Sequence, residues 1–235
     1  MVSVGANGGV APHRPGSIRD MFADIAPRYD LLNTILSLGL HRRWRRFAVS
    51  RWHAPPHTVA LDIATGTGDF AAALAERAER VVGIDFCRPM LDLAARKLRG
   101  RRVSLIAADA LAMPFADASF DIATIAFAQR NVADPGRLYA EIARVLKPGA
   151  TLLALEFARP QRGIAGRVAW WYVKHVVPAI GRLVHSQAYR YLADSIAGFA
   201  APADTTRALT AARFVDIVTR ILSGGVVVLF QAHRS

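Results

Sequence analysis

The sequence contains little cysteine and no long apolar run. Cys87 is the one cysteine in 235 residues, which excludes an internal disulfide framework and any cysteine-based metal cluster. We interpret it as a residue at the start of a helix, and we assign no metal site. No apolar stretch approaches the roughly 20 residues that span a bilayer, and Met1 to Pro15 lacks the apolar core of a signal peptide. We therefore expect a cytoplasmic protein.

Lysine and acidic residues are also scarce. The chain has 30 basic and 18 acidic residues, for a formal net charge of +12, and only three of the basic residues are lysines. Such charge suits nucleic acid, an anionic membrane surface or an acidic substrate. Abundant alanine and arginine also indicate a biased base composition of the genome, which lowers the weight of the charge. Because no recognised nucleic-acid-binding module accompanies it, we expect no nucleic-acid partner.

The segment that organises the chain is Val59 to Phe70, with the sequence VALDIATGTGDF. Its apolar and β-branched residues predict a buried strand that runs into a glycine turn and then a helix, Phe70 to Arg80. Gly66 and Gly68 permit a tight backbone and the close approach of a ligand. Asp69 is suited to cap the helix.

An acidic residue ends the next expected strand, Arg80 to Asp85. Asp85 lies nineteen positions after Gly66, where α/β folds of this kind place a carboxylate on a ribose. One carboxylate matches two neutral hydroxyls well. The order of strand, glycine turn, helix, strand and acid therefore predicts a nucleotide-handling site.

Two cofactor classes compete for this turn. A dinucleotide pyrophosphate requires three glycines in the spacing G-x-G-x-x-G and a helix N-terminus free of negative charge, whereas Gly68 is followed by Asp69. S-adenosylmethionine carries no phosphate, and carboxylates such as Asp62 and Asp69 suit its zwitterionic methionine and cationic sulfonium. The sequence therefore favours S-adenosylmethionine.

The third expected strand and its exit span Arg102 to Asp109. Asp109 and Ala110 then lie at the carboxyl end of the sheet, where a doubly wound fold binds an adenine ring through a side-chain acceptor and a main-chain donor. Met113 is positioned to cover the ring face.

The remaining pattern predicts an α/β fold in which seven strands form a doubly wound, mostly parallel sheet with an antiparallel C-terminal strand. A polar loop, Ala128 to Val132, lies at the edge where reacting groups belong. The other expected elements are helices over Met90–Leu98 and Asp134–Leu146, strands over Asp121–Phe127 and Ala150–Phe157, and a hairpin of Ala212–Leu222 with Gly225–Ala232.

Helices are expected before the first strand. Residues 1–16 read as a disordered leader, and residues 17–235 as one domain. Residues 17–57 form a helical lid over the carboxyl ends of the sheet, with helices over Ser17–Ile25, Tyr29–Leu38 and Leu40–Arg51.

The basic run His41 to Arg46 in this lid has two interpretations of equal weight. One is a solvated helix face, and the other is a role in holding an anionic membrane or ligand, with Trp44 and Phe47 at a lipid headgroup boundary.

A helical insertion, residues 158–199, interrupts the alternation of strands and helices. Its helix Gly163 to Val177 is apolar on most sides, and Arg167 and Lys174 form a narrow basic stripe. This helix either packs on the core, lines a channel for a lipid-like substrate, or touches a membrane.

With these residues in place, the chain resembles the UbiE family of ubiquinone/menaquinone biosynthesis C-methyltransferases over about residues 17–232. The resemblance implies a class I S-adenosylmethionine-dependent methyltransferase fold. The segments that carry it are Met21–Asn33, Leu36–Arg46, Leu61–Asp69, Arg130–Val132, Arg144–Gly149, Leu155–Phe157 and Tyr189–Ile196.

The resemblance also implies site residues. Thr67, Asp85, Asp109 and Ala110 correspond to the family's cofactor contacts. Ala126 belongs to the same set, although the family often has a serine there, and the lost hydroxyl weakens one hydrogen bond by on the order of 1 kcal/mol. The chain departs from the family again before the Arg-Asn-Val motif, at Ala128 and Gln129.

The implied reaction transfers a methyl group to a ring carbon of a reduced, polyprenylated quinol, either demethylmenaquinol or its ubiquinone-pathway counterpart. Arg130 is expected to stabilise the developing oxyanion, and Tyr29 and Asn33 to orient the ring. The proton acceptor is a tyrosine, an aspartate such as Asp30, a histidine or water. We expect a packing or surface role for His185.

Two other functions compete with this one. The first is methylation of another lipophilic phenol or polyketide. The second is a non-catalytic, membrane-surface quinone-binding protein, against which the intact set of Gly66, Gly68 and Asp85 argues. Peripheral contact with the inner face of an anionic membrane is compatible with each function. The head group, the prenyl length and the oligomeric state, including a homo-oligomer, stay open.

Overall fold

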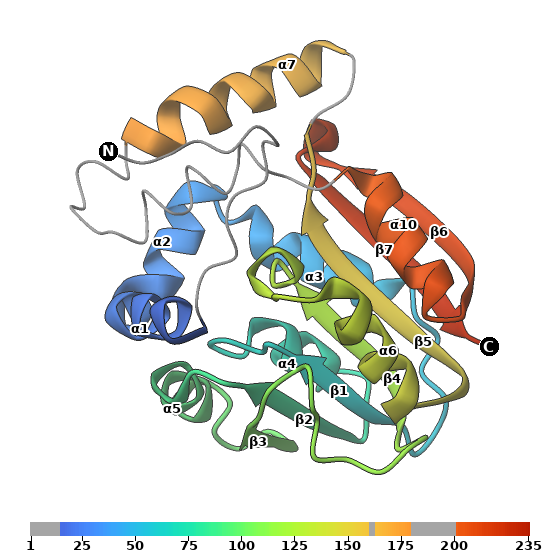
Figure 1. Cartoon of the computed structure of the whole chain (residues 1–235). Helices are drawn as coiled ribbons and strands as arrows, with labels where there is room; N and C mark the ends of the chain where they lie inside the picture. The colour runs from blue at the N-terminus through green and yellow to red at the C-terminus, as the bar shows by residue number, and fades with distance from the viewer. Residues whose placement is uncertain (1–14, 160–162, 180–200) are drawn as a thin grey trace.

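Long buried runs in the sequence become the central strands of one mixed sheet. The computed structural model describes residues 15–159, 163–179 and 201–235. The strand order is β3-β2-β1-β4-β5-β7-β6 (Figure 1). The strands are β1 (Val59–Ile63), β2 (Arg80–Asp85), β3 (Val103–Ala107), β4 (Phe120–Ala126), β5 (Leu146–Phe157), β6 (Phe214–Leu222) and β7 (Val227–Arg234).

Five neighbouring strands are parallel, and β7 is antiparallel to both of its neighbours, β5 and β6. The predicted sheet and its C-terminal hairpin are therefore confirmed. β4 and β5 are buried over most of their length, as expected for parallel strands that are covered on both faces. The sheet includes Leu146, which pairs with Phe120, so β5 begins earlier than the predicted Ala150.

Helices cover both faces of the sheet. On one face, α6 (Pro135–Val145) and α10 (Pro202–Ala211) bury Leu138, Ile142 and Leu209 in the larger core cluster. On the other face, α3 (Leu40–Ser50), α4 (Asp69–Leu74) and α5 (Arg88–Lys97) bury a second cluster that includes Trp44, Phe70 and Ala94. The result is the three-layer arrangement expected of a doubly wound fold. α10 was not among the helices expected from the sequence.

The start of α4 differs from the prediction. Gly68, in a left-handed conformation with φ of +85°, is the N-cap residue, and Asp69 is the first helical residue without a side-chain capping bond. The predicted cap was therefore wrong, and the Asp69 carboxylate forms ion pairs instead. α4 also ends at Leu74 rather than Arg80, because the backbone N–H groups of Glu79 and Arg80 donate to the Thr58 carbonyl.

Two other helix starts agree with the sequence. Cys87 is the N-cap residue of α5 and is buried, so its interpretation as a helix-start residue is confirmed. Asp134 caps α6 by accepting a hydrogen bond from the Arg137 backbone N–H at 2.9 Å, and Pro135 occupies the first helical position, where a missing N–H has no cost.

The lid consists of α1 (Pro15–Ile25), the short 3-10 helix η1 (Ala26–Arg28), α2 (Tyr29–Leu36) and α3. Because α1 begins at Pro15, the last two residues of the predicted leader are helical, and residues 1–14 lie outside the described residues. α1 contacts α5, and α2 contacts α3, so the lid rests on the helices of one face.

α7 (Ile164–Trp171) continues into a single π-helical turn, Tyr172–Val176. Figure 1 shows α7 above α2, and the Tyr172 hydroxyl donates to the Ile35 carbonyl at 3.4 Å. Residues 180–200 of the predicted insertion, which include His185 and the family motif Tyr189–Ile196, lie outside the described residues. Within the described part of the chain, none of the helices has the length and apolar character needed to span a bilayer.

Candidate active site

The crevice between β1 and β4 is the place where the chain reverses its direction of winding. From β1 the chain proceeds to β2 and β3 on one side, and β4 and β5 lie on the other. In doubly wound sheets, ligands bind at the carboxyl ends of the strands at this point. A small inner pocket is found here, lined by Ala64 after β1, Ala126 at the end of β4, and Tyr29 of the lid.

The two glycines of the turn have different roles. Gly66 has φ of +54°, and a Cβ at this position would have no heavy atom of the described residues within 4 Å. Its backbone therefore faces open space that a ligand can approach. Gly68 has φ of +85°, and its Cβ would lie 2.6 Å from Cδ1 of Leu98, the residue that follows α5. The predicted ligand approach therefore fits Gly66, whereas Gly68 allows the turn to pack on α5.

Asp85 fixes the turn against the end of β2. Its Oδ2 accepts from the Gly66 backbone N–H at 2.8 Å, and its Oδ1 accepts from the Cys87 backbone N–H at 2.9 Å. Burial raises the pKa of Asp85, and the backbone hydrogen bonds oppose this. Because an ionised carboxylate has about four acceptor sites, lone pairs remain for ribose hydroxyls.

Asp62 lies at the bottom of the inner pocket and is 1% exposed. Its Oδ2 accepts from the Thr65 hydroxyl at 2.6 Å and its Oδ1 from the Thr124 hydroxyl at 2.7 Å. The Ala71 backbone N–H donates to Oδ2 at 2.9 Å. Burial raises the pKa of Asp62 to about 6, although these hydrogen bonds lower it. The carboxyl therefore connects β1, β4 and α4 at the crevice.

A polar cluster connects the lid to the glycine turn. The Thr67 hydroxyl donates to Asp30 at 2.5 Å, and Lys97 Nζ lies 2.6 Å from Asp30 and 2.9 Å from Asp69. His41 Nε2 lies 3.4 Å from the same Asp69 carboxylate. Burial raises the pKa of Asp69, but the bond to His41 and the charge of Lys97 outweigh it and hold the pKa well below its usual value. Asp69 is therefore ionised and paired.

Asp109 and Ala110 follow β3, two strands away from the crevice. Asp109 is exposed, and its Oδ1 accepts from the Leu111 backbone N–H at 2.8 Å. Met113 is 4% exposed and packs in the core, so its predicted position over an adenine ring is wrong. Neither Asp109 nor Ala110 lines the inner pocket, and their adenine contacts stay a prediction.

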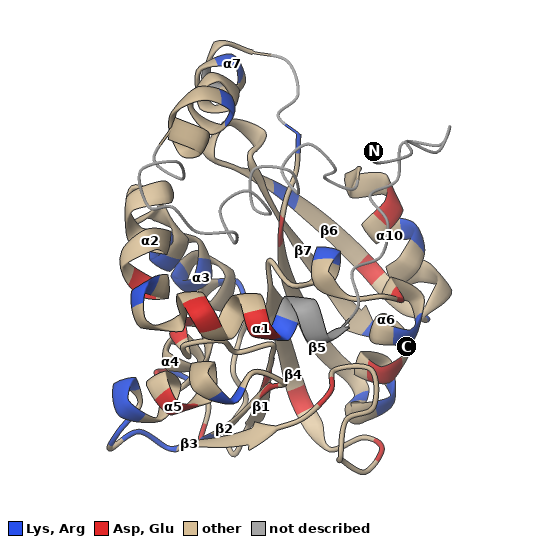
Figure 2. Ribbon diagram, turned by 60° about the vertical axis from the view of Figure 1, so that its left-hand side comes forward, with Lys and Arg blue, Asp and Glu red and all other residues tan. Residues whose placement is uncertain are grey.

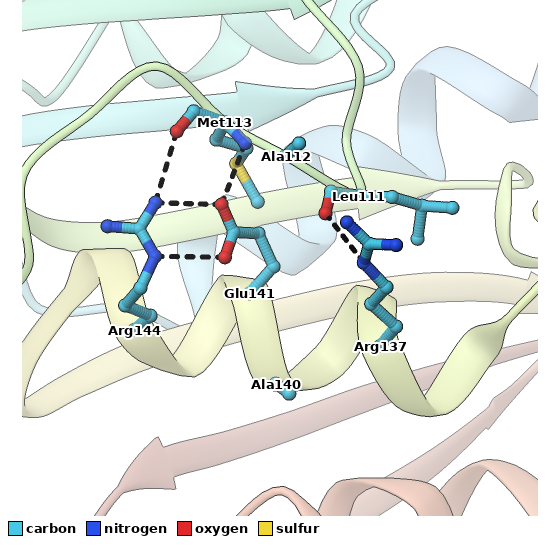
Figure 3. A pocket seen from close by; sticks show the side chains of 7 residues that line it. All are labelled: Leu111, Ala112, Met113, Arg137, Ala140, Glu141 and Arg144. Carbon is cyan, nitrogen blue, oxygen red and sulfur yellow. Dashed lines mark hydrogen bonds and ion pairs between the residues drawn. The ribbon is translucent and has the colours of Figure 1, made fainter.

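The loop after Asp109 is braced by α6. Figure 3 shows a shallow hollow in which Glu141 Oε1 accepts from the Met113 backbone N–H at 2.7 Å and pairs with Arg144 Nη2 at 2.7 Å. Arg144 Nη2 also donates to the Met113 carbonyl, and Arg137 Nε donates to the Leu111 carbonyl. These contacts hold the loop after β3 against α6.

A larger cavity of about 740 Å³ opens beside the inner pocket, within the size range of small-molecule sites. Tyr29 and Arg45 line both spaces. The lid, the strand ends and α7 supply its mostly apolar wall, which includes Met21, Phe22, Leu32, Leu36, Phe127, Phe157, Val168, Ala169, Tyr172, Val173 and Val177. One face of α7 therefore lines a cavity, as the channel interpretation predicts. We call this space the outer cavity.

Arg130 is a second arginine, beside Arg45, at the wall of the outer cavity. It lies in the short 3-10 helix η2 (Gln129–Asn131), and its guanidinium carbon is 4.9 Å from the centroid of the Phe157 ring. Its Nε and Nη1 are buried and have no hydrogen-bond partner among the described residues. Asn33 lines the same cavity. The structure therefore brings Arg130, Asn33 and Tyr29 to one space.

Gln129, where the chain departs from the family pattern, is buried and holds the loop that carries Arg130. Its Oε1 accepts from the Tyr139 hydroxyl at 2.8 Å and from the Thr205 hydroxyl at 3.2 Å. Its backbone N–H donates to Glu156 at 2.9 Å. The departure therefore has a packing function on the side of the loop away from the cavity.

The basic run divides between the interior and solvent. Trp44 is 7% exposed, and its Nε1 donates to the Ser223 hydroxyl at 2.9 Å, so its predicted position at a lipid headgroup boundary is wrong. His41 is also buried, and Arg45 is half-buried at the wall of both cavities. Arg42, Arg43 and Arg46 are exposed. Lys97 was not predicted as a site residue. His41 and Arg45 were predicted only as members of the basic run His41 to Arg46, under its ligand-holding interpretation.

Comparison with known proteins agrees with this geometry. The family model described as the ubiE/COQ5 methyltransferase family matches residues 11–234. A demethylmenaquinone methyltransferase of Thermus thermophilus is 46% identical over 220 residues, which cover 91% of this chain and all of that one. The ubiquinone/menaquinone biosynthesis C-methyltransferase UbiE of Geobacter sulfurreducens is 39% identical, over 92% of this chain and 88% of that one.

A solved structure supports the fold. The S-adenosylmethionine-dependent methyltransferase TM1293 of Thermotoga maritima, described as a possible histamine N-methyltransferase, superimposes with a TM-score of 0.64 at 18% identity. The match covers 93% of this chain and all of that one. The family match and the relatives confirm the expected S-adenosylmethionine-dependent methyltransferase. The chain belongs to the ubiE/COQ5 methyltransferase family.

Proposed function

We propose that this methyltransferase acts on a ring carbon of a reduced, polyprenylated quinol, with demethylmenaquinol as the preferred substrate. The observation that carries the proposal is the buried Arg130 guanidinium, whose Nε and Nη1 have no partner among the described residues and which lies in an otherwise largely apolar cavity. Buried donors of this kind are costly unless a ligand oxygen accepts from them. A lipophilic phenol supplies both the apolar body and that oxygen.

The inner pocket suits S-adenosylmethionine. The Gly66 backbone faces open space, Asp85 retains acceptor sites, and the first turn of α4 carries the acidic Asp69, which would repel a pyrophosphate. The inner pocket has a volume of about 30 Å³, against about 740 Å³ for the outer cavity. The lid residues at its wall, Tyr29 and Arg45, would move to admit a methionine chain.

The side chains of the outer cavity supply the remaining chemistry. S-adenosylmethionine supplies an electrophilic methyl group when it is bound. Arg130 holds the negative charge that develops on the quinol oxygen, which makes the neighbouring ring carbon nucleophilic. Tyr29 and Asn33 orient the ring, and the apolar wall excludes water.

The positions of the side chains reduce the number of candidates for the group that accepts the quinol proton. Asp30 lines neither cavity and is already paired with Lys97 and Thr67. Tyr29 and His41 both line the outer cavity, and they remain with water as proton acceptors.

We further propose that the outer cavity opens toward an anionic membrane surface. Leu38 and Val168 line the cavity and are 71% and 62% exposed, so they mark its mouth. Ile164 and Trp171 of α7 extend this apolar face, which also carries Arg167 and Lys174. We call this set of six residues the docking face.

The charges of the helices near the docking face favour contact with an anionic membrane. Neither α3 nor α7 contains an acidic residue, and Figure 2 shows basic residues on both helices. Exposed apolar and cationic side chains on one surface are typical of interfacial membrane binding. A polyprenyl tail would then pass from the membrane into the cavity without crossing water. The buried, free Cys87 agrees with the reducing cytoplasmic side.

Transfer of labelled methyl from S-adenosylmethionine tests the proposed substrate. The purified chain would be assayed under reducing conditions with demethylmenaquinol, its ubiquinone-pathway counterpart and a phenol that lacks a prenyl tail. We expect turnover to be fastest with demethylmenaquinol. Arg130→Met should lower kcat by about 100-fold, the effect of removing one oxyanion donor, with S-adenosylhomocysteine binding unchanged. Arg96→Met, at the exposed Arg96 on α5, is the matched control.

Methylation of the short phenol alone would contradict the quinol assignment. An equal loss of S-adenosylhomocysteine binding in Arg130→Met would contradict the role of Arg130.

A further inference from the structure

Arg45 is a cation at the junction of the two cavities without an ion pair. Its Nη1 donates to the His41 carbonyl at 3.0 Å, and its guanidinium carbon lies 5.4 Å from the centroid of the Phe127 ring. No carboxylate of the described residues lies within 4.0 Å of it. The backbone bond and the ring contact fix the guanidinium, and its other N–H groups have no partner in the described part of the chain.

The carboxylates of the inner pocket contact groups other than Arg45. Asp69 pairs with Lys97, its Oδ2 lies 3.4 Å from His41 Nε2, and Asp62 accepts from two threonine hydroxyls and one backbone N–H. Arg45 acts on both only at longer range, since its charge is a minor cause that lowers the pKa of each. Arg45 therefore retains hydrogen-bonding capacity for a ligand.

Charge in the inner pocket is otherwise negative. Of the described residues that line it, Arg45 is the one cation, beside Asp62 and Asp69. The methionine end of S-adenosylmethionine carries a positive sulfonium, a positive ammonium and a negative carboxylate. The aspartates suit the two positive groups, and they would repel the carboxylate unless a cation receives it. A guanidinium matches a carboxylate in both charge and shape.

Direction along the sheet agrees with this assignment. Asp85 ends β2, the strand beside β1, whereas Arg45 shares its pocket with Ala126 at the end of β4, on the other side of β1. A cofactor with its ribose at Asp85 therefore points its methionine end toward Arg45.

We infer that Arg45 of the lid binds the carboxylate of the methionine moiety of S-adenosylmethionine. The inference rests on the cofactor assignment and adds a lid residue to it. Because Arg45 also forms part of the wall of the outer cavity, the bound carboxylate would fix the lid side chain that borders the substrate.

The binding of two cofactor analogues, measured by calorimetry, tests this inference without an activity assay. S-adenosylhomocysteine contains the carboxylate, whereas 5′-methylthioadenosine has the same adenosine and sulfur but no amino-acid chain. We expect Arg45→Met to weaken S-adenosylhomocysteine binding by about 10- to 100-fold, the effect of a lost hydrogen bond to a charged group, and to leave methylthioadenosine binding unchanged. Arg45→Lys should retain part of the affinity because it keeps the charge.

Arg46→Met is the matched control, because Arg46 is the neighbouring exposed arginine on the same helix. It should change neither affinity. An equal loss for both ligands in Arg45→Met would overturn the inference and indicate a packing role in the lid. Unchanged binding of S-adenosylhomocysteine would also overturn it. Failure of the wild-type chain to bind S-adenosylhomocysteine would overturn the cofactor assignment together with the inference.

Discussion

A buried carboxyl at the crevice makes stability depend on pH. Asp62 is almost completely buried, and burial raises its pKa from 3.8 to about 6. A raised pKa means that the folded state binds the proton more tightly than the unfolded state does. The stabilisation is therefore fully present below the unfolded pKa, near 4, and is lost as the pH rises through about 6. The shift corresponds to about 3 kcal/mol.

Asp62→Asn removes this titration and serves as the reference. We expect the unfolding free energy of the wild type, relative to that of Asp62→Asn, to fall by up to about 3 kcal/mol between pH 4 and pH 7. Asp69, whose pKa is lowered, is present in both proteins and cancels in the difference. Urea denaturation at several pH values measures it. A constant difference across this range would show that Asp62 has an ordinary pKa.

At the residue scale, spacing along the chain predicted part of the site. The nineteen-residue separation of Gly66 and Asp85 corresponds to a direct hydrogen bond between them. The basic run misled because four arginines dominate its composition, whereas packing depends on the buried stripe of His41 and Trp44. Lys97 gave no local signal, since its partners Asp30 and Asp69 are far away in the sequence.

At the scale of an element, the two glycines of the turn have different functions. Gly66 leaves space for a ligand, and Gly68 allows the turn to pack on the neighbouring helix. Gly68→Ala adds a left-handed penalty of about 1–2 kcal/mol and an overlap with the buried Leu98, which costs about 1–3 kcal/mol more. Gly66→Ala carries only the backbone penalty, because its surroundings are open.

The two glycine variants should therefore fail in different assays. We expect Gly68→Ala to lose about 2–5 kcal/mol of unfolding free energy. Gly66→Ala should lose about 1–2 kcal/mol while binding S-adenosylhomocysteine at least tenfold more weakly, because its methyl group occupies the ligand's approach. Urea denaturation and calorimetry measure the two effects. Equal stability losses, or full binding by Gly66→Ala, would contradict this division.

Elements were predictable where local pattern and tertiary contacts agree. The strands β1, β4 and β5 have apolar runs that match their burial. α4 is shorter than its alanine-rich sequence predicts, and the N–H groups of Glu79 and Arg80, at the end of the predicted helix, donate to the carbonyl of Thr58, the residue before β1. α10 was missed despite its N-terminal Pro202, because its apolar periodicity is weak.

At the scale of the whole molecule, the net charge is +12. The proposed membrane contact is therefore tested by comparing the removal of charges at different places on the surface. Any strongly basic protein binds anionic vesicles to some extent. The docking face predicts a dependence on Arg167 and Lys174 that exceeds the dependence on other exposed arginines. Arg99 and Arg102 provide the comparison. They are exposed and lie at the turn before the edge strand β3.

We expect the double variant Arg167→Gln with Lys174→Gln to weaken sedimentation with vesicles that contain anionic lipid, at about 1 kcal/mol per removed charge. Arg99→Gln with Arg102→Gln should have a smaller effect. Vesicles of neutral lipid alone, and a titration with salt, separate the apolar contribution from the electrostatic one. Equal weakening by both double variants would mean that the total charge acts without a defined face.

Tyr29 and Arg45 belong to the walls of both cavities. The cofactor and the quinol would therefore be separated by the same two side chains. A lid movement that admits S-adenosylmethionine would therefore also open the outer cavity, which holds the quinol. Because each quinol accepts one methyl group, the methylated quinol and S-adenosylhomocysteine must both leave before the next turnover. Movement of the shared wall would open both cavities, so the exchange of the two ligands would be coupled.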